Sequence, residues 1–110
     1  MNWIELKHEY QINEIIEKSQ HKPQTIFKHS TKCSVSSMAK NRLERSDAPE
    51  NTDFYYLDLI SHRNISNIVA EAFSVFHESP QILVIKSGAC VYDESHSAIN
   101  MSEIEEQVGA

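Results

Sequence analysis

The chain has 110 residues, a net charge of −6 and only 10 lysine and arginine residues, which are scattered along the sequence. This length suits one hydrophobic core, so we expect a single domain over residues 1–110. The scattered basic residues argue against nucleic acid as a partner, and no apolar run approaches the roughly 20 residues that span a bilayer.

The first residues lack the basic and then apolar order of a signal peptide, which predicts a cytoplasmic protein without membrane contact. Its two cysteines, Cys33 and Cys90, are far apart and do not form a CxxC motif. A reducing cytoplasm disfavours a structural disulfide between them, so both thiols are expected to be free.

In chain order, residues 3–6 predict a short strand, and isoleucines at helical spacing predict a helix that ends near Lys18. Residues 25–29 are β-branched or aromatic for the most part and predict a buried strand. The apolar positions from Ser34 to about Arg45 share one face of a helix. Cys33 would then lie where a strand gives way to a helix.

Residues 53–59 carry the strongest strand pattern, and their apolar density predicts a central strand. Apolar residues then recur at helical spacing from Ile65 to Phe76, which predicts a helix packed against the sheet. Pro80 follows shortly afterwards.

Two strands are expected at 81–85 and 90–93, joined by a tight turn at Gly88. Asn100 is placed to cap a final helix, with Glu103 completing a reciprocal capping arrangement. The resulting order, β-α-β-α-β-α-β-β-α, predicts an α/β protein with a central mixed sheet flanked by helices. This is the order of the thioredoxin-like fold, in which the redox cysteine starts the second helix.

Cys33 is the leading candidate for chemistry because the first turn of a helix presents unpaired N–H groups and a partial positive charge. Both favour the thiolate, which is the form that attacks a disulfide. Lys32 would add to this effect. The alternative is a buried, inert cysteine that packs as a small apolar residue.

Three stretches resemble the YtxJ-type monothiol bacilliredoxins, thioredoxin-like proteins of bacteria that use bacillithiol in place of glutathione. Residues 30–36, Ser-Thr-Lys-Cys-Ser-Val-Ser, resemble the family's Ser-Thr-x-Cys-Pro-Ile-Ser. Residues 79–81, Ser-Pro-Gln, precede a strand as they do in the family, and residues 86–88 resemble its hairpin turn. The resemblance covers almost the whole chain.

The resemblance implies a monothiol thiol-disulfide oxidoreductase in which Cys33 takes bacillithiol from mixed disulfides on client proteins. Free bacillithiol, a co-substrate and not a bound cofactor, then regenerates the thiol. Its partners would be bacillithiol and bacillithiolated proteins, and we expect a monomer. The substrate-binding residues would be Thr31, Lys32, Ser34, Ser79 and Pro80.

Three positions depart from related patterns. Ser34 replaces the family's proline, which we expect to alter rate or potential without abolishing activity. Ser36 replaces the resolving cysteine of dithiol thioredoxins, so another thiol must resolve the mixed disulfide. Phe27 occupies the place of a buried acid, which excludes a carboxylate proton relay from that position.

Other candidate roles remain open. Ser36 either stabilises the Cys33 thiolate as a second catalytic residue or has no role. The fold predicts a cis bond before Pro80, which would free the backbone groups of Ser79 for an extended client. Cys90 is expected to be structural, at the end of the sheet away from Cys33.

The six histidines show no paired metal-ligand spacing, and no metal site is expected. His29 is near Cys33 in sequence but could point to the other face of its strand. Lys40 and Arg42 either form a solvated helix face or contact the malate part of bacillithiol.

Two other functions compete with the oxidoreductase. A non-catalytic thioredoxin-like binding module would not depend on Cys33. The other alternative is a carrier of an Fe–S cluster, like the monothiol glutaredoxins. Those proteins usually have the motif Cys-Gly-Phe-Ser, of which this chain keeps only Cys33 and Ser36.

Overall fold

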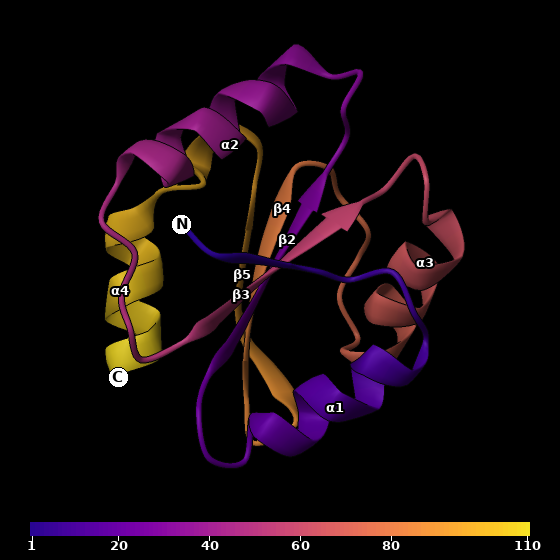
Figure 1. The fold of residues 1–110 in the computed structure, drawn as a ribbon, viewed down its shortest axis with the longest axis vertical. Coiled ribbons are helices and arrows are strands. Elements are labelled where there is room, and N and C mark those ends of the chain that lie inside the picture. The colour runs from indigo at the N-terminus through magenta and orange to yellow at the C-terminus, as the bar shows by residue number, and fades with distance from the viewer.

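The computed structural model describes all residues from 1 to 110 as a five-stranded sheet with helices on both faces (Figure 1). In chain order the elements are β1 (Trp3–Glu5), α1 (Tyr10–Lys18), β2 (Gln24–His29), α2 (Ser34–Arg45), β3 (Asp53–Asp58), α3 (Arg63–Ala72), β4 (Gln81–Lys86), β5 (Ala89–Ser95), the short 3₁₀ helix η1 (His96–Ala98) and α4 (Met101–Gly109). The predicted alternation of strands and helices is confirmed. None of the helices has the length and apolar character needed to cross a membrane.

The strands are arranged in the order β1-β3-β2-β4-β5. β1 and β2 both run parallel to β3, whereas β4 is antiparallel to β2 and β5 is antiparallel to β4. The sheet is therefore mixed, as the element order predicts. The middle position belongs to β2, and β3 is an interior strand beside it.

The central strand β2 separates two apolar layers. α1 and α3 lie on one side of the sheet and α2 and α4 on the other (Figure 1). Ile26 belongs to the core cluster that includes Ile15 of α1 and Val69 of α3. Phe27 belongs to the other cluster, with Leu43 of α2 and Ile104 of α4. Every residue of β2 is buried, because strands flank it on both sides and helices cover both faces.

One sequence prediction about α3 is wrong. The apolar pattern was expected to continue to Phe76, but the helix ends at Ala72 and the side chain of Phe76 is 95% exposed. Ser74 has a φ of 53°, in the left-handed region, and this turns the chain out of the helix. Phe76 therefore lies in the segment that leads to β4, outside the apolar face of α3.

Two local predictions in the C-terminal third are confirmed. The β4–β5 turn contains Ser87 and Gly88 with φ values of 50° and 80°, as a tight hairpin turn of the primed type requires. The side chain of Asn100 accepts a hydrogen bond from Glu103 N–H at 2.9 Å and so caps α4. The reciprocal bond from Glu103 back to Asn100 is not formed.

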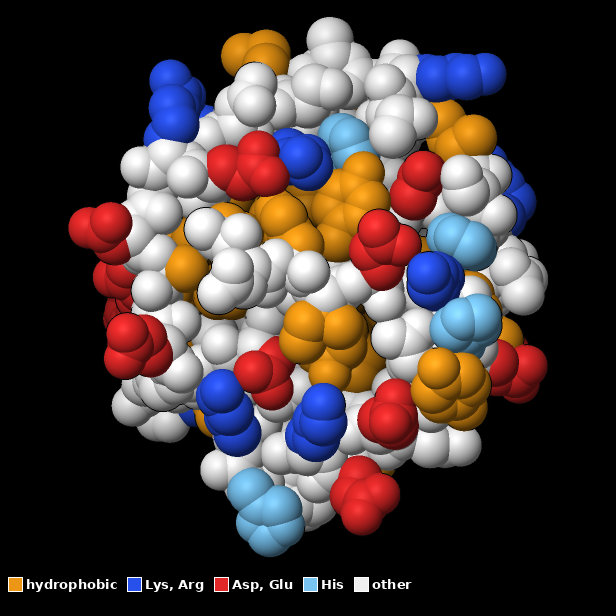
Figure 2. Space-filling model, viewed as in Figure 1, with side chains coloured by type: hydrophobic (Ala, Val, Ile, Leu, Met, Phe, Trp, Pro, Cys, Tyr) orange, Lys and Arg blue, Asp and Glu red, His pale blue; other side chains and the backbone are white.

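Charged side chains are interspersed over the surface. On the face seen in Figure 2, acidic and basic groups alternate and no broad basic patch forms. This face therefore offers no continuous positive surface.

The buried lysine of β2 has an unusual environment. Lys28 is fully buried, and its Nζ lies 3.4 Å from Nδ1 of His77. Burial lowers the pKa of Lys28 from 10.5 to about 8, with a partly offsetting influence of Cys90. Below pH 8 the folded chain therefore carries a desolvated ammonium group without a carboxylate partner.

We expect Lys28→Met to raise the free energy of unfolding at pH 7 by about 1–3 kcal/mol, because methionine fills the space without the buried charge. Since the folded-state pKa is below the unfolded one, the unfolded chain binds more protons between about pH 8 and 10.5. The contribution of Lys28 to the free energy of unfolding of the wild type should accordingly become less unfavourable as the pH rises across that window. The difference in free energy of unfolding between Lys28→Met and the wild type should therefore shrink. Urea unfolding at pH 7 and 9.5 measures both effects, with exposed Lys32→Met as the control.

Candidate active site

Cys33 is the N-cap residue of α2, with extended backbone angles (φ −109°, ψ 122°). The loop from β2 places it there, and its N–H donates to the Ser30 carbonyl at 3.1 Å. Its own carbonyl accepts from Ser37 N–H at 3.0 Å, which starts the helix. The thiol is free and partly exposed, next to the unpaired N–H groups of the first turn. The Cys33 thiol is therefore at a helix N-terminus and accessible from solvent.

Behind Cys33, a buried hydrogen-bond network joins the end of β2 to α2. The Ser36 side chain is fully buried, and its Oγ lies 2.6 Å from Nδ1 of His29. The same Oγ accepts a hydrogen bond from Ser30 N–H at 2.9 Å. In this structure the Ser36 hydroxyl therefore binds these two groups, and none of its hydrogen bonds reaches the Cys33 sulfur. The network fixes the loop that carries Cys33.

His29 was not singled out by sequence reasoning, which left open the face to which it points. It faces α2. Its ring is stacked on Phe27 with the centroids 5.8 Å apart, and it is tilted against the ring of Tyr56 at 5.6 Å. Burial lowers the pKa of His29 below its usual value, and the nearby charge of Lys40 adds to this. The imidazole is therefore neutral at pH 7. The signal in the sequence was the period of two along β2, which puts His29 on the face of Phe27.

The bond before Pro80 is cis, as predicted from the fold. Gln81 pairs with Lys28 in the β2–β4 ladder, so Ser79 and Pro80 lie where β2 ends and the loop to Cys33 begins. The backbone N–H and C=O of Ser79 form no hydrogen bond within the chain, and its buried Oγ also lacks a partner. Cys33, Ser79 and Pro80 thus lie at the same end of the sheet, where β2 ends and β4 begins.

The other predicted substrate-binding residues flank Cys33 in the chain. Thr31 and Lys32 are exposed in the loop before it, and Ser34 is the exposed first residue of α2. The structure therefore places these three side chains on the surface around the thiol. None of them forms a hydrogen bond that would hold it away from an incoming partner.

Cys90 lies at the opposite end of the sheet, as predicted. It pairs with Ile85, which pairs with Gln24 at the start of β2, whereas Cys33 follows the end of that strand. Burial raises the pKa of the Cys90 thiol, and its Sγ donates to the Tyr92 carbonyl at 3.3 Å. Cys90 therefore cannot pair with Cys33, and its thiol is unreactive at neutral pH compared with that of an exposed cysteine.

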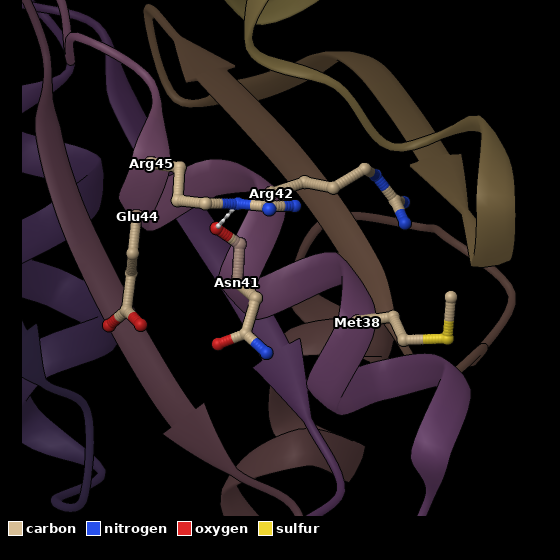
Figure 3. A pocket seen from close by; sticks show the side chains of 5 residues that line it. All are labelled: Met38, Asn41, Arg42, Glu44 and Arg45. Carbon is tan, nitrogen blue, oxygen red and sulfur yellow. Dashed lines mark hydrogen bonds between the residues drawn. The ribbon is translucent and has the colours of Figure 1, made fainter.

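The outer face of α2 carries a shallow pocket of about 520 Å³. Its five lining residues are drawn in Figure 3, namely Met38, Asn41, Arg42, Glu44 and Arg45. They come from the later turns of α2, and neither this pocket nor the one beside β1 contains Cys33. The partly exposed Cys33 thiol thus lies outside both pockets.

The two basic residues considered for an anionic ligand have partners within the chain. The Arg42 guanidinium donates to the Ile99 carbonyl at 3.0 Å and so ties α2 to the segment before α4. Lys40 forms an ion pair with Glu44 at 3.0 Å and lies 5.6 Å from the ring of Tyr56. These contacts give both residues a structural role on α2.

Comparison with known proteins gives a consistent result. The family model described as Monothiol bacilliredoxin BrxC matches residues 4–104. A solved structure described as a candidate oxidoreductase with a thioredoxin fold is 30% identical, with a TM-score of 0.78 over 94% of this chain and 90% of that one.

More distant solved structures share the fold. Thioredoxin from Trypanosoma brucei brucei is 10% identical with a TM-score of 0.76, over 99% of this chain and 93% of that one. Malassezia sympodialis thioredoxin is 15% identical with a TM-score of 0.74, over 98% of this chain and 89% of that one. The predicted thioredoxin-like fold is confirmed.

Proposed function

The chain belongs to the monothiol bacilliredoxin family, and from this premise we propose that it removes bacillithiol from mixed disulfides on client proteins, with Cys33 as the nucleophile. The family and the oxidoreductase-like fold support a thiol redox role. The observation that carries the proposal is the place of Cys33 at the N-cap of α2, with a serine and not a second cysteine one turn later. Such a site can exchange a disulfide but cannot close one internally.

The proposed reaction consists of two exchanges. In the first, the Cys33 thiolate attacks the bacillithiol sulfur of the mixed disulfide, the client thiolate leaves, and Cys33 becomes bacillithiolated. In the second, the thiolate of a free bacillithiol attacks that adduct, which regenerates the Cys33 thiolate and releases the symmetric bacillithiol disulfide. Over the two exchanges, free bacillithiol is oxidised to its disulfide and the client thiol is restored to its reduced state. No bound cofactor takes part.

Client recognition is proposed to use the end of the sheet that carries Cys33 and Ser79. The unpaired N–H and C=O of Ser79 would bind an extended client backbone or the bacillithiol moiety, in the manner of an added strand. The exposed side chains of Thr31, Lys32 and Ser34 would contact the substrate beside the thiol. We propose no metal in this mechanism, because both exchanges need only thiolates.

A turnover experiment tests the proposal. A bacillithiolated peptide is incubated with excess free bacillithiol, with and without a catalytic amount of the protein, and release of the peptide thiol is followed by mass spectrometry. We expect the peptide thiol to be released faster with the protein than without it. In the presence of the protein, we expect slower release when glutathione replaces free bacillithiol. Equal rates with and without the protein would contradict the proposed function.

A further inference from the structure

The segment that joins α3 to β4 is anchored by side chains of both elements. The Phe76 carbonyl accepts a hydrogen bond from Nε2 of Gln81 at 3.0 Å, and Glu78 N–H donates to Oε1 of the same side chain at 3.4 Å. Nδ1 of His77 lies 3.2 Å from Ser66 Oγ of α3. These contacts fix the segment against α3 and the start of β4 before any partner binds.

The backbone groups of this segment alternate between bound and unpaired. In an extended chain, the N–H and C=O of one residue point to the same side, and those of the next residue point to the other. Phe76 C=O and Glu78 N–H, which Gln81 binds, belong to one side. The N–H and C=O of His77 and Ser79 belong to the other side, and none of them forms a hydrogen bond within the chain. This is the pattern of a strand edge without a partner strand.

An apolar pocket lies beside this edge. It has a volume of about 320 Å³ and is lined by Ala70, Ser74, Val75 and Phe76. Val75 packs against the core, whereas the Phe76 side chain is 95% exposed. Aromatic residues are enriched at the centres of protein interfaces, and the pocket gives this one an apolar surface against which a partner's side chain can pack.

An extended client segment can reach both Ser79 and the pocket. Phe76 and Ser79 are three residues apart, so their Cα atoms are separated by at most about 11 Å. Ser79 precedes the cis bond at the end of the sheet where the loop to Cys33 begins. A client that pairs with Ser79 therefore reaches Phe76 with about three further residues.

We propose that residues 76–79 accept an extended client segment as an added strand, paired through the backbone of His77 and Ser79, and that the pocket beside Phe76 takes an aliphatic client side chain. The main-chain hydrogen bonds bind clients regardless of their sequence. The pocket selects those with a residue such as leucine a few positions from the modified cysteine. The inference rests on the proposed function, which places the client disulfide at Cys33.

The test follows exchange between Cys33 and synthetic peptides in a Cys90→Ala background. Each peptide has one cysteine activated as a thiopyridyl disulfide and one leucine, which is moved along an otherwise alanine sequence. Cys33 attacks the peptide sulfur, thiopyridone leaves, and its absorbance gives the second-order rate. We expect leucine about three to five residues from the cysteine to raise this rate on the order of fivefold over the all-alanine peptide.

Phe76→Ala should bring the ratio of the leucine rate to the alanine rate close to one. Because Phe76 is exposed, its replacement leaves the core intact. Val91→Ala is the matched control, since Val91 is a half-exposed apolar residue of β5 beside Cys90, at the opposite end of the sheet. This variant should keep the parent ratio. Each rate is divided by the rate of the same variant with dithiodipyridine, which removes any change in the reactivity of the thiol.

N-methylation of successive peptide residues tests the strand pairing. It should slow exchange at alternate residues only, because an added strand uses every second N–H. Slowing without this alternation, equal rates for all leucine positions, or a leucine preference that survives Phe76→Ala would overturn the inference. A dimer that dissociates in Phe76→Glu would also overturn it, because a second copy would then fill the pocket. The exchange uses no bacillithiol, so its outcome is independent of whether bacillithiol transfer occurs.

Discussion

Replacing Cys33 with serine is expected to reduce the turnover of bacillithiolated peptide to the uncatalysed rate. A serine hydroxyl does not ionise near pH 7 and is a poor attacker of disulfide sulfur, so the first exchange has no nucleophile. We expect a loss of at least about 1,000-fold in the protein-dependent rate, in line with the removal of other catalytic nucleophiles. Peptide thiol release under multiple-turnover conditions measures the effect.

Cys90→Ala is the matched control for this prediction. Cys90 is half-buried at the far end of the sheet, and burial raises the pKa of its thiol. Its loss should leave the turnover rate close to that of the wild type. If Cys33→Ser keeps its rate while Cys90→Ala loses it, the assignment of the nucleophile is wrong. If neither the wild type nor either variant accelerates release of the peptide thiol, the protein acts as a binding module.

The second large effect is expected from Ser36→Cys. It places a thiol one turn after Cys33 on the same side of α2, where dithiol thioredoxins carry their resolving cysteine. A bacillithiolated Cys33 would then be attacked within the chain, and bacillithiol would leave without an external thiol. Because intramolecular attack replaces a bimolecular step, we expect the adduct to decay roughly 100-fold faster or more when free bacillithiol is absent.

Ser37→Cys is the control for added thiol content, since it introduces the same group at the next position, on a different side of the helix. The adduct on this variant should persist as in the wild type. Intact-mass measurements after removal of free bacillithiol follow the decay. Equal lifetimes for Ser36→Cys and Ser37→Cys would contradict the geometry assigned to the first turn of α2.

The sequence predicted the fold well because the signals of this fold are local. Periodicity located the four α-helices and the five strands but not the 3₁₀ helix η1, and the strand-helix-strand order predicted which strands run parallel. The prediction failed at Phe76, because the apolar spacing continues to that residue whereas the helical backbone ends at Ala72. The left-handed Ser74 that ends α3 carries no distinctive residue type.

The sequence predicted the parts of the site that depend on position along the chain. It did not predict contacts between side chains of different elements. The place of Cys33 followed from the boundary between a strand and a helix, and the cis bond at Pro80 followed from the fold. The pairing of His29 with Ser36 did not, because it depends on which face of β2 meets α2. The burial of Lys28 was equally hidden, since lysine is rarely a core residue.

The most direct test of the account is a single exchange without free thiol. Reduced protein is mixed with an equal amount of bacillithiolated peptide, quenched with acid, and analysed by intact and peptide mass. The account predicts one bacillithiol adduct per protein on the peptide that contains Cys33, with matching release of the peptide thiol. No adduct at neutral pH, or an adduct that forms on Cys90 as fast as on Cys33, would contradict it.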